Sequence, residues 1–466
     1  MKVNPNDTLE MKSVNSIVEL LNEHRLFFSS QKTKNIAFRI SSLKKLKDAI
    51  LKYEDKLLAA LWIDLHKSNE EAYLTEISIV VQELNLHIKH LKKWAKPKSV
   101  ITPIYLFPSR SKIWQEPLGV SLIIAPWNYP FQLLINPLVG AISAGCCAVL
   151  KPSPNTPNVA LVMEELIKET FDSNYISVIQ GGREINTLLL EQRFDVIFFT
   201  GSPALGKVVM KAAAAYLTPV ILELGGKSPC LVDEDANLAV AAKRIIWGKT
   251  INAGQTCIAP DYLLVHEKVK EELLTLLKQT IEQMFGTTIQ QSKFYPRIVN
   301  EQAFLRLTNL MCEGNIRIGG ETDAKDKFIA PTVIDEIKPE FMIMKEEIFG
   351  PILPVLTFSN LAKAIDFVNA NEKPLAIYYF GNTETATRLF NKTSSGGGCI
   401  NDTLMHVTNH HLPFGGVGNS GQGKYHGKGS FLAFSNQRGV VTTPTWIDLP
   451  FKYAPFKYFK WMQKFL

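Results

Sequence analysis

Between residues 120 and 226, short apolar runs alternate regularly with helical stretches. The runs are VSLIIAP (120–126), CAVLKPS (147–153), YISVIQG (175–181), FDVIFFTGS (194–202) and TPVILELGG (218–226). Helical stretches of about ten to fifteen residues between them predict βαβ units and a parallel sheet. The runs are apolar throughout, as expected for strands that helices cover on both faces. The sequence therefore predicts an α/β fold.

The flanking segments predict further elements. Residues 14–96 carry apolar side chains at spacings of three and four, which is typical of helices and includes the stretch 39–65. The Pro-rich, polar stretch 96–119 indicates a linker or an extended arm. A second α/β region begins at about residue 227. Its clearest strands are DYLLVHE (261–267), PTVIDEI (331–337), PILPVLTF (351–358) and LAIYYFG (375–381), and its clearest helices span 268–285 and 361–370.

Length and composition limit the class of protein. A chain of 466 residues predicts two or three domains, and 46% hydrophobic with 20% charged residues is ordinary for a globular protein. The net charge of +7 comes without zinc-finger spacing or a run of arginines, so a nucleic-acid-binding protein is not indicated. The six cysteines are scattered, which favours a reducing cytoplasm. We expect neither a secretory signal nor a transmembrane helix.

One cysteine lies in the segment NAGQTCIAP (252–260). Cys257 follows a flexible Gly–Gln–Thr approach and precedes Ile–Ala–Pro. A free cysteine is usually a small buried hydrophobe, and that interpretation leads when the segment is taken alone. The other interpretation is a catalytic nucleophile, and it depends on what the rest of the chain supplies.

Two other polar residues could assist such a nucleophile. Glu223 ends an apolar run in LELGGKSP (222–229), where burial would raise its pKa and suit a general base. A salt-bridged carboxylate is the alternative. Asn128 lies between prolines in IIAPWNYPF (123–131), where a rigid amide could stabilise an oxyanion. An ordinary turn asparagine is the alternative.

The turn FFTGSPALGK (198–207) follows a predicted strand and opens a predicted helix. Ser202 can cap this helix, and Pro203 suits its first turn. Gly201 and Gly206 allow a close approach of the backbone. A helix N-terminus offers free N–H groups and partial positive charge to a phosphate. Because the turn lacks a GxGxxG pattern, a plain βα turn remains equally compatible.

Two more positions suit ligand binding. Lys151 lies at the carboxyl end of a predicted strand in VLKPSPNTP, where α/β folds bind ligands. Glu347 and Phe349 lie on a turn ahead of a strand in KEEIFGPIL (345–353). Taken singly, a solvated lysine and a surface acid are the simpler interpretations.

In their order along the chain, these motifs resemble the aldehyde dehydrogenase superfamily. They are PWNYP, LKPS, FTGS, LELGGKSP, GQTCIAP, EEIFGP and LPFGGVGNSGQGKYHG. The resemblance extends from about residue 15 to 440, and the ending LPFGGVGNSGQGKYHGKGSF (412–431) resembles the class 3 branch, which includes fatty-aldehyde dehydrogenases. It implies a Rossmann-type cofactor domain, an α/β catalytic domain and a small bridging element for oligomerisation.

The resemblance also implies a reaction. Cys257 matches the nucleophile that forms a thiohemiacetal with the aldehyde, and Asn128 with the Cys257 N–H matches the oxyanion site. Hydride then passes to the nicotinamide and leaves a thioester. Glu223 matches the base that activates water to hydrolyse it. The implied activity is oxidation of an aldehyde to the carboxylic acid, and the branch favours a long-chain or apolar aldehyde.

The implied cofactor is NAD or NADP, with no metal. Lys151 matches the contact to the adenosine ribose, Ser202 the contact to the pyrophosphate, and Glu347 the contact to the nicotinamide ribose. The other implied cofactor residues are Trp127, Gly201, Gly206, Gly225, Gly226 and Phe349. The family usually reads Lys-Pro-Ser/Ala-Glu, whereas this chain has Pro154 in place of the acid. The group that would repel a 2′-phosphate is missing, which makes use of NADP plausible.

The resemblance divides the chain into parts. These are a dinucleotide-binding domain (1–84 and 108–225), a catalytic domain (226–401), a bridging element (85–107 and 402–455) and a basic aromatic tail (456–466). Relatives in this branch are dimers, so we expect a cytoplasmic homodimer. The tail is expected on the partner near the substrate entrance, and contact with a membrane surface is the alternative.

Family analogy also points to the substrate pocket. The side chains expected to line it are Tyr129, Trp247 and the region 404–412. His406, His410 and His411 are expected in a substrate-mouth loop rather than a metal site, because no cysteine or carboxylate set accompanies them.

Two other functions remain open from the residues alone. A thiol hydrolase or acyltransferase would use Cys257 through the same thioester, but it would not need the cofactor motifs. A non-catalytic binding protein would not need Cys257, Glu223 and Asn128 together.

Overall fold

The apolar runs between residues 120 and 226 form strands of one six-stranded sheet in the computed structural model, which describes residues 5–456 and 458–463. The strand order is β17-β7-β6-β3-β4-β5, and only β17 is antiparallel to its neighbour. The strands are β3 (Val120–Ile124), β4 (Cys147–Lys151), β5 (Ile176–Val178), β6 (Val196–Gly201), β7 (Val220–Leu224) and β17 (Gly421–Gln422). The predicted α/β fold is confirmed.

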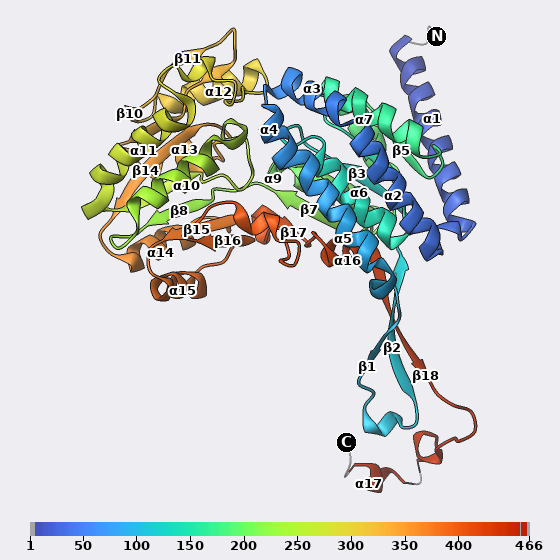
Figure 1. Cartoon of the computed structure of the whole chain (residues 1–466). Coiled ribbons are helices and arrows are strands. Elements are labelled where there is room, and N and C mark those ends of the chain that lie inside the picture. Colours follow the sequence, from blue (N-terminus) through green and yellow to red (C-terminus); the bar gives the residue numbers. More distant parts are fainter. Residues whose placement is uncertain (1–4, 457, 464–466) are drawn as a thin grey trace.

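Helices surround this sheet (Figure 1). They are α1 (Pro5–Ser29), α2 (Ile36–Lys52), α3 (Glu54–Leu65), α4 (Asn69–Ala72), α5 (Ser78–Trp94), α6 (Gln132–Ala144), α7 (Pro157–Thr170), α8 (Arg183–Leu190), α9 (Pro203–Ala214) and α16 (Lys428–Ala433). The predicted helix over 39–65 is interrupted at Tyr53, whose ψ of 5° is not helical and whose hydroxyl donates to Glu169 at 2.7 Å. A π-helical turn, Tyr73–Ile77, joins α4 to α5.

A second sheet of seven strands forms the other lobe of the molecule (Figure 1). Its order is β10-β13-β14-β9-β8-β15-β16, and all neighbours are parallel except β10 and β13. The strands are β8 (Pro229–Val232), β9 (Tyr262–His266), β10 (Asn315–Ile318), β13 (Thr332–Asp335), β14 (Ile352–Phe358), β15 (Ala376–Phe380) and β16 (Gly397–Ile400), beside a hairpin of β11 (Thr322–Asp323) and β12 (Phe328–Ile329).

The helices of this lobe include two that the sequence predicted, α11 and α14. The set is α10 (Leu238–Thr250), α11 (Lys270–Phe285), α12 (Glu301–Met311), α13 (Met342–Lys345), α14 (Leu361–Asn369) and α15 (Thr383–Lys392). The chain passes from the first sheet to the second between β7 and β8. The segment between these two strands contains Gly225 and Gly226, which the sequence analysis assigned to the candidate site. That site is therefore expected where the two lobes meet.

A three-stranded arm projects from the first lobe (Figure 1). It consists of β1 (Lys98–Val100), β2 (Arg110–Pro117) and β18 (Ser435–Thr442), and β2 pairs with β18 along its whole length. The stretch 96–119 is therefore part of an extended arm and not a linker. The short helix α17 (Phe459–Met462) lies near the tip of the arm. Across residues 5–456 and 458–463, no helix is long and apolar enough to span a bilayer.

Candidate active site

A cavity of about 600 Å3 has Cys257 in its wall. The lining is mostly apolar and comes from segments far apart in the sequence. The predicted pocket residues Tyr129 and Trp247 line it, as do Leu404, Met405, Val407 and Thr408 from the predicted region 404–412. These residues therefore share one cavity with Cys257. The cavity also receives Met284, Phe285 and Phe294, which no sequence motif indicated.

Buried side-chain hydrogen bonds hold the loop that carries Cys257. The loop follows α10 through a tight turn, Ile251–Gly254. Gln255 is fully buried, and its Nε2 donates to the Arg297 carbonyl at 3.0 Å while its Oε1 accepts the Val299 N–H at 2.9 Å. The loop is thus fixed against the segment before α12, which gives the cysteine a defined position.

The thiol of Cys257 lies in surroundings that favour its neutral form. Burial raises the pKa of Cys257, and the carboxyl groups of Glu347 and Glu223 raise it further. The backbone N–H groups of Cys257 and Ile258 act in the opposite direction, because they stabilise a thiolate. The thiol must therefore lose its proton as part of the reaction.

Glu223 ends strand β7 and is 3% exposed. Neither carboxyl oxygen has a hydrogen-bond partner among the described residues. Burial raises the pKa of Glu223 well above its usual range, and Lys424 offsets this only in part. The salt-bridged alternative is therefore not what the geometry shows. A buried carboxyl without a partner is costly to a fold, which is typical of a group kept for chemistry.

Asn128 lies in the loop after β3 and is 2% exposed. Its backbone oxygen accepts from Lys67 Nζ and from Asn252 Nδ2, both at 2.8 Å. Its own Nδ2 donates to the Gln255 carbonyl at 3.0 Å. Because an amide nitrogen carries two hydrogens, one N–H of Asn128 remains for a substrate oxygen.

Glu347 lies directly over the chain crossing between the lobes. A side chain at Gly225 would overlap the Glu347 carboxyl group, and the Gly226 N–H donates to this carboxyl. Burial raises the pKa of Glu347 to about 8. Trp127 and Phe349 pack edge to face beside it, with ring centroids 5.3 Å apart. Position 225 must therefore be glycine, because any other side chain there would collide with the Glu347 carboxyl group.

Lys151 ends β4 and is buried to 1% exposure. Its Nζ donates to the carbonyls of Pro152 at 2.8 Å and Gly181 at 2.7 Å. Burial lowers the pKa of Lys151 to about 8. The interpretation as a simple solvated lysine is wrong, because the amine is enclosed by protein carbonyls.

The turn after β6 has the predicted helix cap. Ser202 accepts the Leu205 N–H at 3.4 Å, and Pro203 is in the first turn of α9. A Cβ at Gly206 would come within 2.7 Å of Leu224, so this glycine allows α9 to pack closely on β7. A Cβ at Gly201 would meet an aromatic ring of its own strand. Both glycines therefore serve packing within the protein.

Several polar residues near Cys257, four of them buried and Glu71 partly buried, were not predicted from the sequence. They are Lys67, Glu71, Glu76, Asn252 and Gln255. No motif or periodicity marks Lys67, Glu71 or Glu76. Asn252 and Gln255 belong to the segment NAGQTCIAP, but their roles depend on contacts with segments far apart in the chain.

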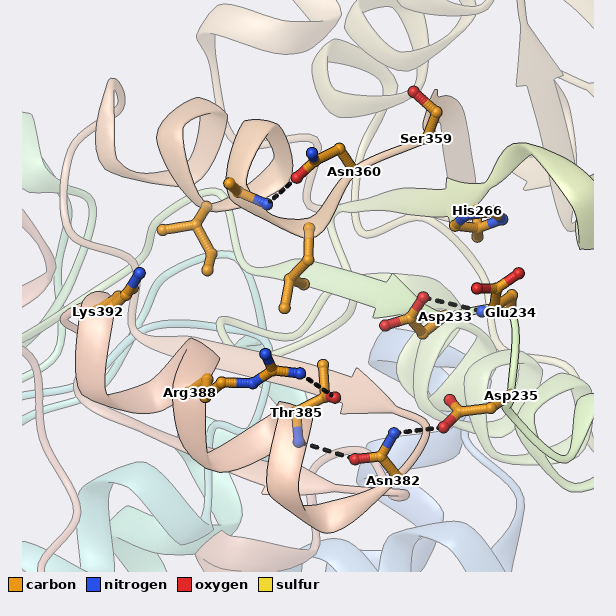
Figure 2. Close-up of a pocket in the computed structure, with 13 residues that line it drawn as sticks. Asp233, Glu234, Asp235, His266, Ser359, Asn360, Asn382, Thr385, Arg388 and Lys392 are labelled. Carbon is orange, nitrogen blue, oxygen red and sulfur yellow. Dashed lines mark hydrogen bonds between the residues drawn. The ribbon is translucent and has the colours of Figure 1, made fainter.

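A second hollow of about 430 Å3 lies at the carboxyl ends of β8, β9, β14 and β15 (Figure 2). Its acids bond within the protein: Asp233 accepts from the Tyr379 hydroxyl at 2.7 Å, and Asp235 accepts from the N-cap asparagine of α15. Cys257 and Glu347 precede β9 and β14, so they lie at the opposite, amino ends of these strands. This hollow is separate from the candidate active site.

The three predicted loop histidines contact different partners. The His406 ring packs near Phe414, with centroids 6.0 Å apart. His410 Nδ1 lies 2.9 Å from Glu83 Oε2, and His411 is exposed. In the part of the chain that the structure describes, no group of three or more His, Cys, Asp or Glu side chains could hold a metal ion. The neighbouring residues of this loop line the cavity.

Comparisons with known proteins identify the family. Residues 11–440 match the aldehyde dehydrogenase family. A 4,4′-diaponeurosporen-aldehyde dehydrogenase of Staphylococcus aureus is 50% identical over 456 residues, which cover 97% of this chain and 99% of that protein. Aldehyde dehydrogenase family 3 member A2 of Macaca fascicularis is 45% identical over 415 residues, with coverages of 89% and 86%.

Two further matches concern assembly and fold. A dimeric, NADP-preferring aldehyde dehydrogenase of Canis lupus familiaris is 43% identical over 445 residues, with coverages of 95% and 98%. The solved structure of substrate-bound Staphylococcus aureus AldH superposes with a TM-score of 0.94 at 49% identity, covering 96% of this chain and 99% of that chain. Because the family match spans nearly the whole chain and its relatives include family 3 members, this chain belongs to the aldehyde dehydrogenase family, in the class 3-like branch.

Proposed function

We propose that this enzyme oxidises long-chain or apolar aldehydes to carboxylic acids, with NAD or NADP as the oxidant. The observation that carries the proposal is the apolar cavity of about 600 Å3 that ends at Cys257. Burial of an alkyl chain there is favourable by about 0.8 kcal/mol per CH2 group. The relative that acts on diaponeurosporen-aldehyde supports an apolar substrate, because that aldehyde is named in a protein 50% identical to this one.

In the first half of the reaction, Cys257 loses its proton to solvent water, and its sulfur attacks the aldehyde carbon. The C–S bond forms as the carbonyl electron pair moves to oxygen. The free N–H of Asn128 and the backbone N–H of Cys257 donate to that oxygen. Bound NAD or NADP supplies an acceptor for the hydride that leaves the substrate carbon, and a thioester on Cys257 results.

In the second half, Glu223 removes a proton from water, and the water oxygen attacks the thioester carbon. The C–S bond breaks, so Cys257 leaves as a thiolate and the carboxylic acid is released. The raised pKa of Glu223 suits this role, because a carboxyl that ionises closer to neutral pH is a stronger base. Its lack of a partner among the described residues leaves both oxygens for water.

The residues present fit a nicotinamide dinucleotide. Lys151 uses two of its three N–H groups on protein carbonyls, and the third would reach the adenosine ribose. Ser202 and the N-terminus of α9 would hold the pyrophosphate. The carboxyl group of Glu347 would accept from the nicotinamide ribose, with Phe349 and Trp127 beside it.

We also propose a division of the chain that agrees with these cofactor contacts. Residues 1–84 and 108–225 would form the dinucleotide-binding domain, and residues 226–401 the catalytic domain. Residues 85–107 and 402–455 would form the bridging element. Pro154 removes the acid that would repel a 2′-phosphate, so we expect NAD and NADP both to be accepted.

We also infer a homodimer in the cytoplasm. The arm sheet is exposed along β1 and most of β18, and a three-stranded sheet with little core of its own gains stability from a partner. A relative 43% identical is named as dimeric.

The six cysteines are all free, which agrees with a reducing compartment. The tail 456–466 would pack on the partner, and membrane contact is the alternative. Lys457 and residues 464–466 of this tail lie outside the described residues.

The deciding experiment records absorbance at 340 nm with decanal or acetaldehyde, each with NAD or NADP. We expect rapid reduction with decanal and a lower kcat/KM for acetaldehyde. Equal or better turnover of acetaldehyde would contradict the apolar substrate. Cleavage of acyl esters without reduction of either cofactor would favour the thiol hydrolase instead.

A further inference from the structure

Glu71 is one of two acidic residues in the wall of the mostly apolar cavity. Of the residues that line the cavity within the described chain, only Glu70 and Glu71 carry a charge. Their environments differ, because Glu70 is exposed whereas Glu71 is partly buried and bonded to the protein. Glu71 Oε1 accepts the backbone N–H of Asn252 at 2.8 Å. This bond joins α4 to the loop of Cys257, across 181 positions of sequence.

The bond is made at a point where the backbone has an unfavourable conformation. Asn252 and Ala253 both have φ of 51°, in the left-handed region that L-residues rarely adopt. Both residues are buried. Two consecutive residues in this region persist only when the surroundings hold them there. Glu71 provides such a restraint at the first of the two.

Asn252 in turn forms hydrogen bonds both to Asn128, the proposed oxyanion donor, and to the loop that carries Cys257. Its Nδ2 donates to the Asn128 carbonyl at 2.8 Å and to the Gln255 carbonyl at 3.0 Å. Asn128 Nδ2 donates to the same Gln255 carbonyl at 3.0 Å. A displacement of Asn252 would therefore shift the oxyanion donor and the segment leading to Cys257 together.

The opposite side of this network is already fixed by a buried ion pair. Lys67 Nζ lies 2.8 Å from Glu76 Oε1 and also donates to the Asn128 carbonyl at 2.8 Å. Glu76 Oε2 accepts the backbone N–H groups of Phe131 and Gln132. The segment 67–76 thus holds the Asn128 loop through Lys67 and Glu76. It holds the Cys257 loop through Glu71.

We propose that Glu71 is a positioning residue for aldehyde oxidation: by holding the left-handed turn at Asn252, its carboxylate keeps Cys257 and Asn128 in register with each other. The inference rests on the proposed function. Glu71 does not itself react, and its effect on the chemical step passes through Asn252.

The charge on Glu71 makes this restraint dependent on pH. Burial raises the pKa of Glu71 to about 7, while the nearby Lys67 acts to lower it and Glu76 to raise it. The other ionisable groups close to it are the phenols of Tyr129 and Tyr295. Above about pH 7 the acceptor is a carboxylate, and charge-assisted bonds are roughly twice as strong as neutral ones. Below about pH 7 the bond weakens.

The test compares Glu71→Ala and Glu71→Gln with the wild-type enzyme, using decanal and saturating NAD or NADP. We expect Glu71→Ala to lower kcat by about 10- to 100-fold, as small misplacements of reacting groups do. KM for decanal should change little. Glu71→Gln retains a neutral acceptor, so above pH 7 its kcat should lie between those of Glu71→Ala and wild type. It should also flatten the part of the kcat–pH profile near pH 7, whereas the part due to Glu223 remains.

Two controls separate positioning from other effects. Glu70→Gln removes a charge from the same cavity without touching the Asn252 turn, so its effect should fall on KM rather than kcat. Asn69→Ala changes an exposed residue of the same short helix and should leave activity at the wild-type value.

Each outcome has a distinct meaning. If Glu71→Ala keeps the wild-type kcat, or if Glu71→Gln retains the wild-type pH profile, the positioning role is wrong. Equal losses of kcat in Glu70→Gln and Glu71→Gln would likewise overturn it, because they would indicate a cavity charge effect. Failure of the wild-type enzyme to reduce either cofactor would instead contradict the proposed function. If Glu71→Ala does not fold, the Gln variant and its pH profile still decide.

Discussion

At the scale of single residues, the site gathers acidic groups whose pKa values are raised by burial. Cys257, Glu223 and Glu347 each have a raised pKa, and the two carboxyl groups act on the thiol. Like charges held close together cannot all ionise at once. The neutral forms of these groups are therefore favoured, whereas the proposed reaction requires Cys257 as a thiolate and Glu223 as a carboxylate at their respective steps.

The first prediction concerns the nucleophile. Cys257→Ala removes the sulfur that bonds to the aldehyde carbon, so dehydrogenase activity should fall to background. Cofactor binding should persist, because the proposed contacts of Lys151, Ser202 and Glu347 are unchanged. NADH fluorescence titration and the assay at 340 nm measure the two properties separately. Near-normal turnover in this variant would contradict the role of Cys257 as the nucleophile.

The second prediction concerns the base. Glu223→Gln should give one rapid burst of reduced cofactor followed by slow turnover, because acylation needs no base on water but deacylation does. The steady rate should fall by about 10²- to 10⁴-fold, the usual contribution of a general base. Stopped-flow absorbance resolves the burst. A burst lost together with the steady rate would indicate a role of Glu223 before acylation.

The third prediction concerns stability. The folded-state pKa of Glu223 is raised, so between pH 4.5 and that value the folded chain keeps a proton that the unfolded chain has lost. The free energy of unfolding therefore falls as pH rises through this window, by about 1.4 kcal/mol per pKa unit. The Glu223→Gln variant does not lose this free energy of unfolding as pH rises, because glutamine does not ionise. Thermal unfolding should show a variant that gains stability over wild type at pH 8 and much less at pH 5; a gain that is the same at both values would contradict burial of an ionisable Glu223.

The residues that the sequence identified are those that belong to contiguous motifs. Cys257, Glu223 and Asn128 could be named because short segments around them resemble a family. Glu71 could not, because its bond to Asn252 joins segments 181 positions apart. An acid in a short helix has no local feature that separates it from a solvated one.

At the scale of elements, the central strands were predictable because each is an unbroken apolar run with helices on both sides. Strand β8 was not predicted, since it is only four residues long and follows directly on a Gly-rich crossing. Helix α10 (Leu238–Thr250) was not among the clearest helices that the sequence predicted. The arm strand β2 was ambiguous, because its exposed residues lack the pattern of a core strand.

The crossing between β7 and β8 yields the fourth prediction. Gly225→Ala places a methyl group where the Glu347 carboxyl lies, so Glu347 must move away from the Gly226 N–H. We expect Kd for NADH to rise about 10-fold or more, since a single hydrogen bond to a charged group contributes roughly 1.5–3 kcal/mol. Gly429→Ala is the matched control, because its new methyl group meets only ordinary contacts. Equal affinities in both variants would remove Glu347 from the cofactor site.

At the scale of the whole molecule, residues of both lobes line the cavity, and none of its described lining residues comes from the arm strands. The arm nevertheless has one face that is neutral in β2 and β18, to which β1 adds Lys98 opposite Ile113. In the pairing of β2 with β18, Val441 lies opposite Ser111 and Gly439 opposite Ile113. The other face carries positive charge from Arg110, Lys112 and Arg438. A partner is therefore expected on the neutral face.

The last prediction tests that assembly. Val441 is 53% exposed on β18, and Val441→Glu places a charge on the neutral face, where burial against a second copy would be costly. Light scattering should give twice the chain mass of 52.2 kDa for wild type and a single mass for the variant. Thr442→Glu is the matched control, because successive residues of a strand point to opposite faces, and it should remain dimeric.

A wild-type protein that is monomeric would contradict the dimer, and binding of that monomer to anionic vesicles would favour the membrane role of the tail. If Val441→Glu stays dimeric, the interface lies elsewhere than on this face of the arm.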